Sequence, residues 1–171
     1  MRITEILGGS EPCFSFEFFP PKTEEGATAL FETVEDLYRL NPGYVSVTYG
    51  AAGSTREGTV EVTTRIKRDY GIETMAHLSV VGETVEGIET ILARFADAGI
   101  ENVLALRGDP PRGETDFKPA PGGLRTSAEL AAFIRANERT ANFGIGASCH
   151  PEVHPEAASA EADIAYLREK V

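Results

Sequence analysis

The sequence feature that most constrains this chain is a short strand-like run that recurs along it, with a helical pattern between successive copies. The runs are rich in β-branched and aromatic residues, and the first four begin about 30 residues apart, which is the length of a βα unit. The five predicted strands are Phe14–Phe19, Tyr44–Tyr49, Thr74–Val81, Val103–Leu106 and Phe143–Ser148. This alternation predicts an α/β fold with a parallel sheet.

Helical patterns fill the segments between these runs, with apolar residues three and four positions apart. The predicted helices are residues 27–38, 58–70, 85–95 and 164–171, together with one that begins after Thr126. In this last case Thr126 and Glu129 form a capping-box pattern, in which the threonine is the N-cap and the glutamate stands three residues on.

Two architectures fit the alternation, a doubly wound open sheet and an eight-fold barrel. A dinucleotide-binding doubly wound sheet carries a glycine-rich turn after its first strand, whereas Phe18-Phe19-Pro20-Pro21 stands at that place here. A barrel instead carries polar functional groups at the carboxyl ends of several strands. Such groups are present: Glu17, Thr48, His77, Asp109, His150, Glu152 and His154. The sequence therefore favours the (β/α)8 TIM-barrel family.

Five strands are too few to close such a barrel, which needs eight units and about 250 residues. We therefore expect a single domain over residues 1–171, the N-terminal part of a barrel with about five βα units and without its C-terminal strands. Either the chain is a fragment or another chain supplies the rest. The first interpretation is favoured. One hypothesis that follows from it is a non-catalytic fragment, which would aggregate or dimerise through its open sheet edges, and the other is an enzyme that is active in its full-length form.

The charge of the chain limits its partners. A formal net charge of −11 disfavours nucleic acid and anionic membrane surfaces, because both would repel it. No apolar run approaches the roughly 20 residues that span a bilayer, and the first residues lack the pattern of a signal peptide. The expected location is the cytoplasm.

Glu17 is the first candidate catalytic residue. Four phenylalanines flank it between residues 14 and 19, and strand alternation puts Ser15 and Glu17 on one face. A carboxylate beside aromatic bulk loses hydration, and such a group can donate a proton near neutral pH. The alternative is a strand-end glutamate paired with a lysine or arginine.

Two loops carry further candidates. Arg107-Gly108-Asp109 opens a long segment rich in Pro and Gly, either a functional loop or a solvated turn with an Arg–Asp pair. The segment His150–Glu156 holds two histidines and two glutamates. It is open to three interpretations: a metal site, hydrogen bonding to an organic cofactor, or the approach to a helix. The metal interpretation describes a barrel hydrolase using His77, His150, His154 and Asp109.

Taken together, these segments resemble the methylenetetrahydrofolate reductase family. The matching motifs are Ser15-Phe16-Glu17-Phe18-Phe19-Pro20-Pro21, Val45-Ser46-Val47-Thr48-Tyr49-Gly50, His77-Leu78, Leu104-Ala105-Leu106-Arg107-Gly108-Asp109 and Pro151-Glu152-Val153-His154-Pro155-Glu156-Ala157. They stand in the family's order and spacing, and the resemblance runs from about Phe14 to Val171.

The resemblance implies a barrel flavoprotein of folate and one-carbon metabolism that uses FAD. Hydride would pass from NADH or NADPH to the flavin and then to 5,10-methylenetetrahydrofolate, yielding 5-methyltetrahydrofolate. Glu17 would be the proton donor that helps to open the methylene bridge of the folate substrate. Asp109 would influence the flavin and the folate, and Thr48 would lie near the nicotinamide. A homo-oligomer is a further expectation.

The resemblance also implies a set of residues that hold FAD. They are Tyr49, Ala51, His77, Arg107, Gly108, Asp109, His154, Ala157, Asp163 and Lys170. Arg107 and Lys170 would offset the negative charge of the pyrophosphate. Three positions depart from the family: His150 replaces a frequent tyrosine that stacks near the flavin, Tyr166 replaces an asparagine, and Glu169 replaces a basic residue.

Overall fold

The computed structural model describes residues 1–49, 54–110, 113 and 117–170, and the side chains of residues 54–56 are not included in that description. Its strands are β1 (Ser15–Phe18), β2 (Tyr44–Val47), β3 (Glu73–Ser79), β4 (Asn102–Leu106) and β5 (Gly144–Ala147). They form one sheet in the order β1-β2-β3-β4-β5, and every neighbouring pair is parallel. All five predicted strands are confirmed, with ends that differ from the prediction by at most two residues.

The sequential strand order distinguishes between the two predicted architectures. A doubly wound sheet reverses its order at a switch point, whereas each strand here lies beside the next one along the chain. Right-handed crossovers in a single direction put the connecting helices on one face, as in the wall of a barrel. The prediction of an α/β fold with five parallel βα units is therefore confirmed, as an open sheet in the described part of the chain.

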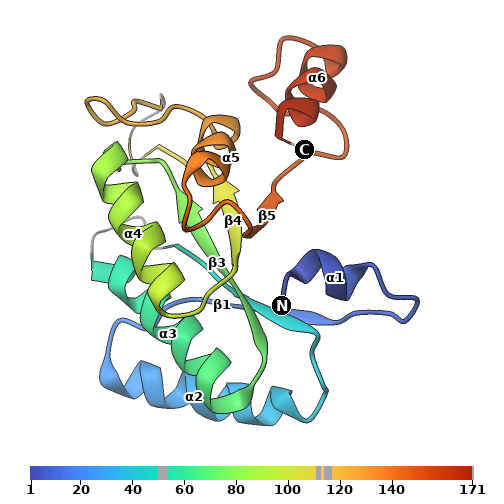
Figure 1. Cartoon of the computed structure of the whole chain (residues 1–171), viewed down its shortest axis with the longest axis vertical. Helices are drawn as coiled ribbons and strands as arrows, with labels where there is room; N and C mark the ends of the chain where they lie inside the picture. The colour runs from blue at the N-terminus through green and yellow to red at the C-terminus, as the bar shows by residue number, and fades with distance from the viewer. Residues whose placement is uncertain (50–53, 111–112, 114–116, 171) are drawn as a thin grey trace.

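The predicted helices are also confirmed. They are α2 (Glu24–Tyr38), α3 (Ser54–Tyr70), α4 (Val85–Asp97), α5 (Ser127–Ala136) and α6 (Ala160–Lys170). Figure 1 shows α2, α3 and α4 along one side of the sheet, with α6 beyond the end of β5. None of the helices that the structure describes has the length and apolar character that crossing a membrane requires.

The capping box predicted at α5 is half right. The hydroxyl of Thr126 accepts the backbone N–H of Glu129 at 3.1 Å, so the N-cap is confirmed. The carboxylate of Glu129 accepts the N–H of Arg125 at 2.6 Å instead of that of Thr126. The glutamate therefore binds the backbone of Arg125, the residue before the N-cap, and the Thr126 hydroxyl still fixes the start of α5.

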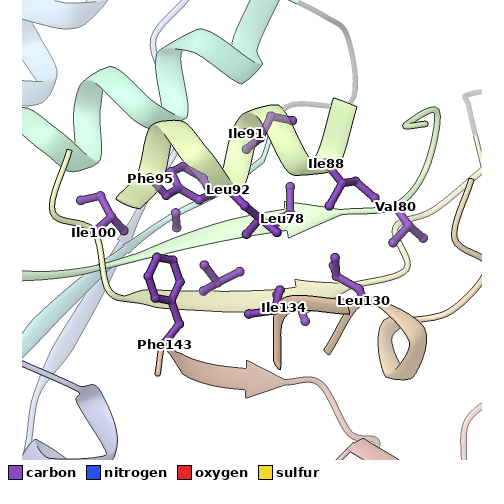
Figure 2. Packing of buried hydrophobic residues seen from close by; sticks show 13 residues of the cluster. Leu78, Val80, Ile88, Ile91, Leu92, Phe95, Ile100, Leu130, Ile134 and Phe143 are labelled. Atoms are coloured by element: carbon purple, nitrogen blue, oxygen red, sulfur yellow. The ribbon is translucent and has the colours of Figure 1, made fainter. Parts of the chain in front are cut away.

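The side of the sheet that faces the helices is packed in two clusters. The first joins β1 and β2 to α2 and α3, and the second joins β3 and β4 to α4 and α5. In the second cluster Leu92, Phe95 and Leu130 are fully buried. Figure 2 shows Leu92 of α4 directed at β3, and Phe143, just before β5, belongs to the same cluster. Burial of these apolar side chains is the main stabilising contribution to the sheet–helix packing.

A short helix that the sequence did not predict, α1 (Ile3–Leu7), lies at the amino ends of the strands. Asn102, fully buried at the start of β4, holds it there. The Asn102 side chain accepts the N–H of Ile3 at 2.8 Å and donates to the carbonyl of Met1 at 3.0 Å and to Glu73 at 3.1 Å. This end of the sheet is thus closed by a satisfied polar network, and the opposite end carries the candidate functional residues.

Candidate functional site

A cavity of about 670 Å³ lies at the carboxyl ends of β4 and β5. Its walls come from the residues that follow these two strands, from the start of α5 and from α6, and we call it the carboxyl-end cavity. The predicted site residues that line it are Arg107, Gly108, Asp109, His150, His154, Ala157, Asp163 and Lys170. The chain folds so that these eight residues from two loops and one helix surround a single space.

Arg107 is held in this cavity by a bidentate ion pair. Its Nη1 and Nη2 atoms lie 2.5 and 3.0 Å from the two carboxylate oxygens of Glu156. This pairing raises the pKa of Arg107 and lowers the pKa of Glu156. The guanidinium also lies 5.4 Å from the centre of the Phe117 ring. Arg107 is therefore oriented toward the cavity with its charge already matched by a carboxylate.

Glycine is the residue type that fits position 108. Its φ is +84°, in the left-handed region, and a Cβ built there would lie 2.1 Å from the hydroxyl oxygen of Ser79. That hydroxyl donates to the carbonyl of Arg107 at 2.9 Å. The close approach lets the chain turn directly after β4, which brings Asp109 to the cavity rim with an exposed side chain.

The two histidines of the second loop stack edge to face. The rings of His150 and His154 have centroids 4.6 Å apart and an interplanar angle of 78°. The backbone N–H of His154 donates to Asp163 at 2.9 Å, and Nδ1 of His154 accepts the N–H of Glu156 at 3.0 Å. Asp163 thus fixes the loop to α6, and Nδ1 of His154 is an acceptor, so a proton on the neutral ring resides on Nε2.

Lys170 and Tyr166 join α6 to the rest of the cavity wall. Lys170 donates to the carbonyl of Ser148 at 2.6 Å, and its Nζ lies 4.7 Å from the centre of the Tyr166 ring. The Tyr166 hydroxyl is 3.1 Å from the hydroxyl of Ser127 at the start of α5. The tyrosine that departs from the family pattern therefore links two helices across the cavity.

The charges that line the carboxyl-end cavity do not favour an anion by simple sum. Its two cationic side chains, Arg107 and Lys170, stand against four carboxylates, Asp109, Glu152, Glu156 and Asp163. One of these carboxylates is already paired with Arg107. The binding of a negatively charged ligand would therefore depend on the positions of Arg107 and Lys170, and on displacement of Glu156 from Arg107.

A second hollow, of about 330 Å³, lies on the face of the sheet that points away from the helices, and we call it the inner-face hollow. Glu17 from β1, Ser46 from β2 and His77 from β3 line it. The Ser46 hydroxyl donates to Oε2 of Glu17 at 3.2 Å, and Nε2 of His77 lies 3.4 Å from the same oxygen. Three neighbouring strands therefore each contribute one polar group to this hollow.

His77 is a buried histidine whose Nε2 atom has no hydrogen-bond partner among the described residues. Its pKa is lowered by burial, and the nearby carboxylate of Glu17 offsets part of that effect. Although Nε2 lies within ion-pair distance of Glu17, the angles do not make a hydrogen bond, and the atom has no hydrogen-bond partner among the described residues. The ring is thus neutral at pH 7 and presents a polar atom that a ligand can satisfy.

The predicted shielding of Glu17 is wrong. Its side chain is 52% exposed in the inner-face hollow. Phe16 and Phe18 point to the helix side of the sheet and join the core cluster there, while Phe14 and Phe19 are 67% and 73% exposed. Strand alternation separates the aromatic side chains from the carboxylate, so closeness in sequence does not bring them together in space.

Thr48 and Tyr49, the described candidates after β2, lie outside the linings of both hollows. Thr48 accepts a hydrogen bond from the hydroxyl of Thr59 through its carbonyl at 2.9 Å. Tyr49 packs against the second core cluster, and its hydroxyl donates to the buried Glu83 at 2.5 Å. Ala51 lies outside the described residues. Among the described residues, the fold therefore does not group Thr48 and Tyr49 with the other predicted cofactor residues.

The four residues of the metal-site alternative are not brought together. His77 lines the inner-face hollow, whereas His150, His154 and Asp109 line the carboxyl-end cavity. Within the described ranges, no group of three or more His, Cys, Asp or Glu side chains is placed to hold a metal ion. The alternative of a metal-dependent hydrolase therefore has no support in this geometry.

Two residues of the site were missed as functional candidates. Ser46 is paired directly with Glu17 in the β1–β2 register, and alternation along the predicted strand puts it on the face opposite Val45 and Val47. Glu156, in the histidine-containing loop, binds Arg107 across 49 residues of sequence. Knowledge of the β1–β2 register would have shown that Ser46 lies beside Glu17, whereas no local sequence pattern shows that Glu156 pairs with Arg107.

Comparison with known proteins relates the chain to a family. Residues 2–171 match the family described as methylenetetrahydrofolate reductase. The chain is 40% identical over 179 aligned residues to methylenetetrahydrofolate reductase (NADH) 1 of Zea mays, covering 99% of this chain and 30% of the relative. It is 38% identical to 5,10-methylenetetrahydrofolate reductase of Salmonella typhimurium, covering 92% of this chain and 50% of the relative. The chain thus spans about a third to a half of the length of these relatives.

Proposed function

The chain belongs to the methylenetetrahydrofolate reductase family, and on that premise we propose that it acts in the reduction of 5,10-methylenetetrahydrofolate to 5-methyltetrahydrofolate, with NADH or NADPH as the reductant. The observation that carries the proposal is the position of Glu17. Its carboxylate stands half exposed in the inner-face hollow, beside a buried neutral histidine. A carboxyl group in such a place can reach a bound substrate and give it a proton.

FAD is the proposed cofactor, and the residues of the carboxyl-end cavity fit it in part. Arg107 and Lys170 are the cations that can face a pyrophosphate, and the flat rings of His150 and His154 offer surfaces for a planar group. The unpartnered Nε2 of His77 can be satisfied by a polar atom of a ligand. Bound FAD would supply hydride transfer, accepting from NADH or NADPH and delivering to the folate.

The proposed role of Glu17 is to protonate a ring nitrogen of the folate substrate. The proton opens the methylene bridge and leaves an electrophilic iminium carbon, which is the form that accepts hydride. Asp109, which lies on the turn after β4 and lines the carboxyl-end cavity, is proposed to influence the charge near the bound ligand. Thr48 is proposed to lie near the nicotinamide of the reductant, and the folate is the proposed substrate of the whole protein.

The proposal is tested by mixing the purified 171-residue chain with FAD, removing free cofactor and recording the visible absorption spectrum. NADH and NADPH oxidation and folate reduction are then measured on the same sample. We expect a bound flavin band and reduction of the folate by one or both nicotinamides. Metal content measured on the same preparation serves as the control. A stoichiometric metal ion with no flavin bound would contradict the proposal.

Replacing Glu156 with glutamine is expected to strengthen FAD binding about two- to fivefold. In the chain without ligand the Glu156 carboxylate is paired with the guanidinium of Arg107, so it competes with the pyrophosphate of FAD for that cation. An exposed ion pair contributes up to about 1 kcal/mol, which corresponds to about fivefold in affinity. The measurement is a titration of FAD into the chain followed by flavin fluorescence.

The matched control is Glu152→Gln, which removes one carboxylate from the same loop and leaves the Arg107–Glu156 pair in place. A smaller gain is expected for this control. Equal gains in both variants would mean that only the total charge of the cavity matters. Weaker binding by Glu156→Gln would mean that Glu156 orients Arg107 for the ligand and does not compete with it.

A further inference from the structure

Ser46 and Glu17 are direct neighbours across two strands. In the parallel β1–β2 pair Glu17 stands opposite Ser46, so both side chains leave the sheet on the same face. The Ser46 hydroxyl is nearly buried, with 9% of the residue exposed, and donates to Oε2 of Glu17 at 3.2 Å. The β-sheet register itself therefore brings a hydrogen-bond donor to the proposed acid.

A second group approaches the same oxygen from the next strand. Nε2 of His77, a residue only 7% exposed, lies 3.4 Å from Oε2 of Glu17. The other carboxylate oxygen, Oε1, makes no hydrogen bond within the described part of the chain, and the Glu17 side chain is 52% exposed. The two carboxylate oxygens are therefore distinct, because the protein contacts Oε2 and leaves Oε1 to the open side of the hollow.

We propose that Ser46 is a positioning residue for Glu17: its hydroxyl holds Oε2 beside His77, so that Oε1 carries the proton to the substrate. This inference rests on the proposed function and extends it to a residue outside the acid itself. A half-exposed glutamate has several rotatable bonds, and holding it in one orientation lowers the entropy cost of the proton transfer.

The neighbourhood of His77 supports this arrangement. Burial lowers the pKa of His77 and leaves its ring uncharged at neutral pH. A neutral ring adds no positive charge beside Oε2 of Glu17, so the Ser46 hydroxyl is the hydrogen-bond donor that the described residues offer to that oxygen. The other titratable side chain that lines the hollow is Tyr44 from β2, and the lining residues of β4 and β5 carry no titratable group. A change in the titration midpoint of His77 therefore reports a change in the charge or the position of Glu17.

The first test measures the titration of His77 by NMR in the chain without cofactor. The His77 signal is identified by its loss in His77→Gln, since the chain has three histidines. Because the Glu17 charge raises the pKa of His77, Glu17→Gln is expected to lower the titration midpoint. Ser46→Ala is expected to shift it in the same direction, because the carboxylate is released from His77. Ser46→Thr keeps a hydroxyl and is expected to titrate as the unmodified chain does.

The matched control is Ser15→Ala, which removes a hydroxyl two residues before Glu17 on the same face of β1. It is expected to leave the His77 midpoint unchanged. The proposal is overturned if Ser46→Ala also leaves the midpoint unchanged while Glu17→Gln moves it, or if Glu17→Gln itself has no effect. Amide spectra of each variant establish that the sheet is intact, and Ser46→Thr provides the comparison if the alanine variant is unfolded.

The second test compares two rates in the chain loaded with FAD. Ser46→Ala is expected to lower kcat for folate reduction about 10- to 100-fold relative to NAD(P)H oxidation with a quinone acceptor, with the KM for folate little changed. Ser46→Thr is expected to restore most of the loss. An unchanged ratio of the two rates would overturn the role in proton delivery. If the unmodified chain reduces no folate, the proposed function fails, and the His77 titration still decides whether Ser46 positions Glu17.

Discussion

Replacing Glu17 with glutamine is expected to slow folate reduction about 10²- to 10⁴-fold, the contribution typical of a positioned acid or base. Glutamine has nearly the same shape as glutamate and can still accept the hydrogen bond from Ser46, but its amide cannot deliver an acidic proton. Because reduction of a quinone needs no proton from this residue, the loss is expected in folate reduction relative to NAD(P)H–quinone turnover. Steady-state rates of the two reactions, measured on one FAD-loaded sample, give the ratio.

The matched control is Glu32→Gln, which changes an exposed carboxylate of α2 in the same way and lies on the helix side of the sheet. It is expected to leave both rates as they are. Equal losses of both reactions in Glu17→Gln would indicate damage to cofactor binding and would contradict the assignment of Glu17 as the proton donor. A small loss in folate reduction alone would point to a proton that comes from solvent.

Truncating Phe95 to alanine is expected to lower the free energy of unfolding by about 3–5 kcal/mol, the cost typical of emptying a large aromatic site in a core. Phe95 is fully buried in the cluster between α4 and the sheet (Figure 2). A domain of this size has about 5–15 kcal/mol of stability in total, so a large share would be lost. The corresponding fall in melting temperature is about 6–20 °C.

Urea and thermal unfolding of Phe95→Ala are compared with those of Phe14→Ala, which removes the same ring from a site that is 67% exposed. The exposed variant is expected to unfold nearly as the unmodified chain does. Phe95→Leu fills part of the space and is expected to show a smaller loss, which keeps the test decisive if the alanine variant does not fold. Similar stabilities for Phe95→Ala and Phe14→Ala would contradict the burial of Phe95.

The positions of the strands and helices were predictable because they depend on residues close together in sequence. Alternation over four to six residues marks a strand, and apolar residues three and four apart mark a helix. The threonine N-cap at Thr126 was predictable for the same reason, since its partner is three residues away. Helix α1 was not predictable, because five residues carry too little periodicity and its place is set by Asn102, about a hundred residues further along the chain.

The expectation about Glu17 shows where local reasoning fails. The prediction placed Glu17 correctly on a strand, but it was wrong about the surroundings of the side chain. Of the flanking phenylalanines, Phe16 and Phe18 pack into the core cluster on the helix side, and Phe14 and Phe19 are exposed to solvent. The groups that do surround it, Ser46 and His77, stand on the next two strands. Strand register, which is set by pairing across the sheet, decides these contacts.

The sequence by itself determined the βα alternation, the family and the residue types available for chemistry, since each depends on order and spacing along the chain. Only the tertiary structure decided which of those residues meet. It joined Arg107 to Glu156 across 49 residues and Ser46 to Glu17 across 29, and it divided the three histidines between two hollows on different parts of the sheet. Contacts of this kind depend on the packing of the whole sheet, because no short segment contains both partners.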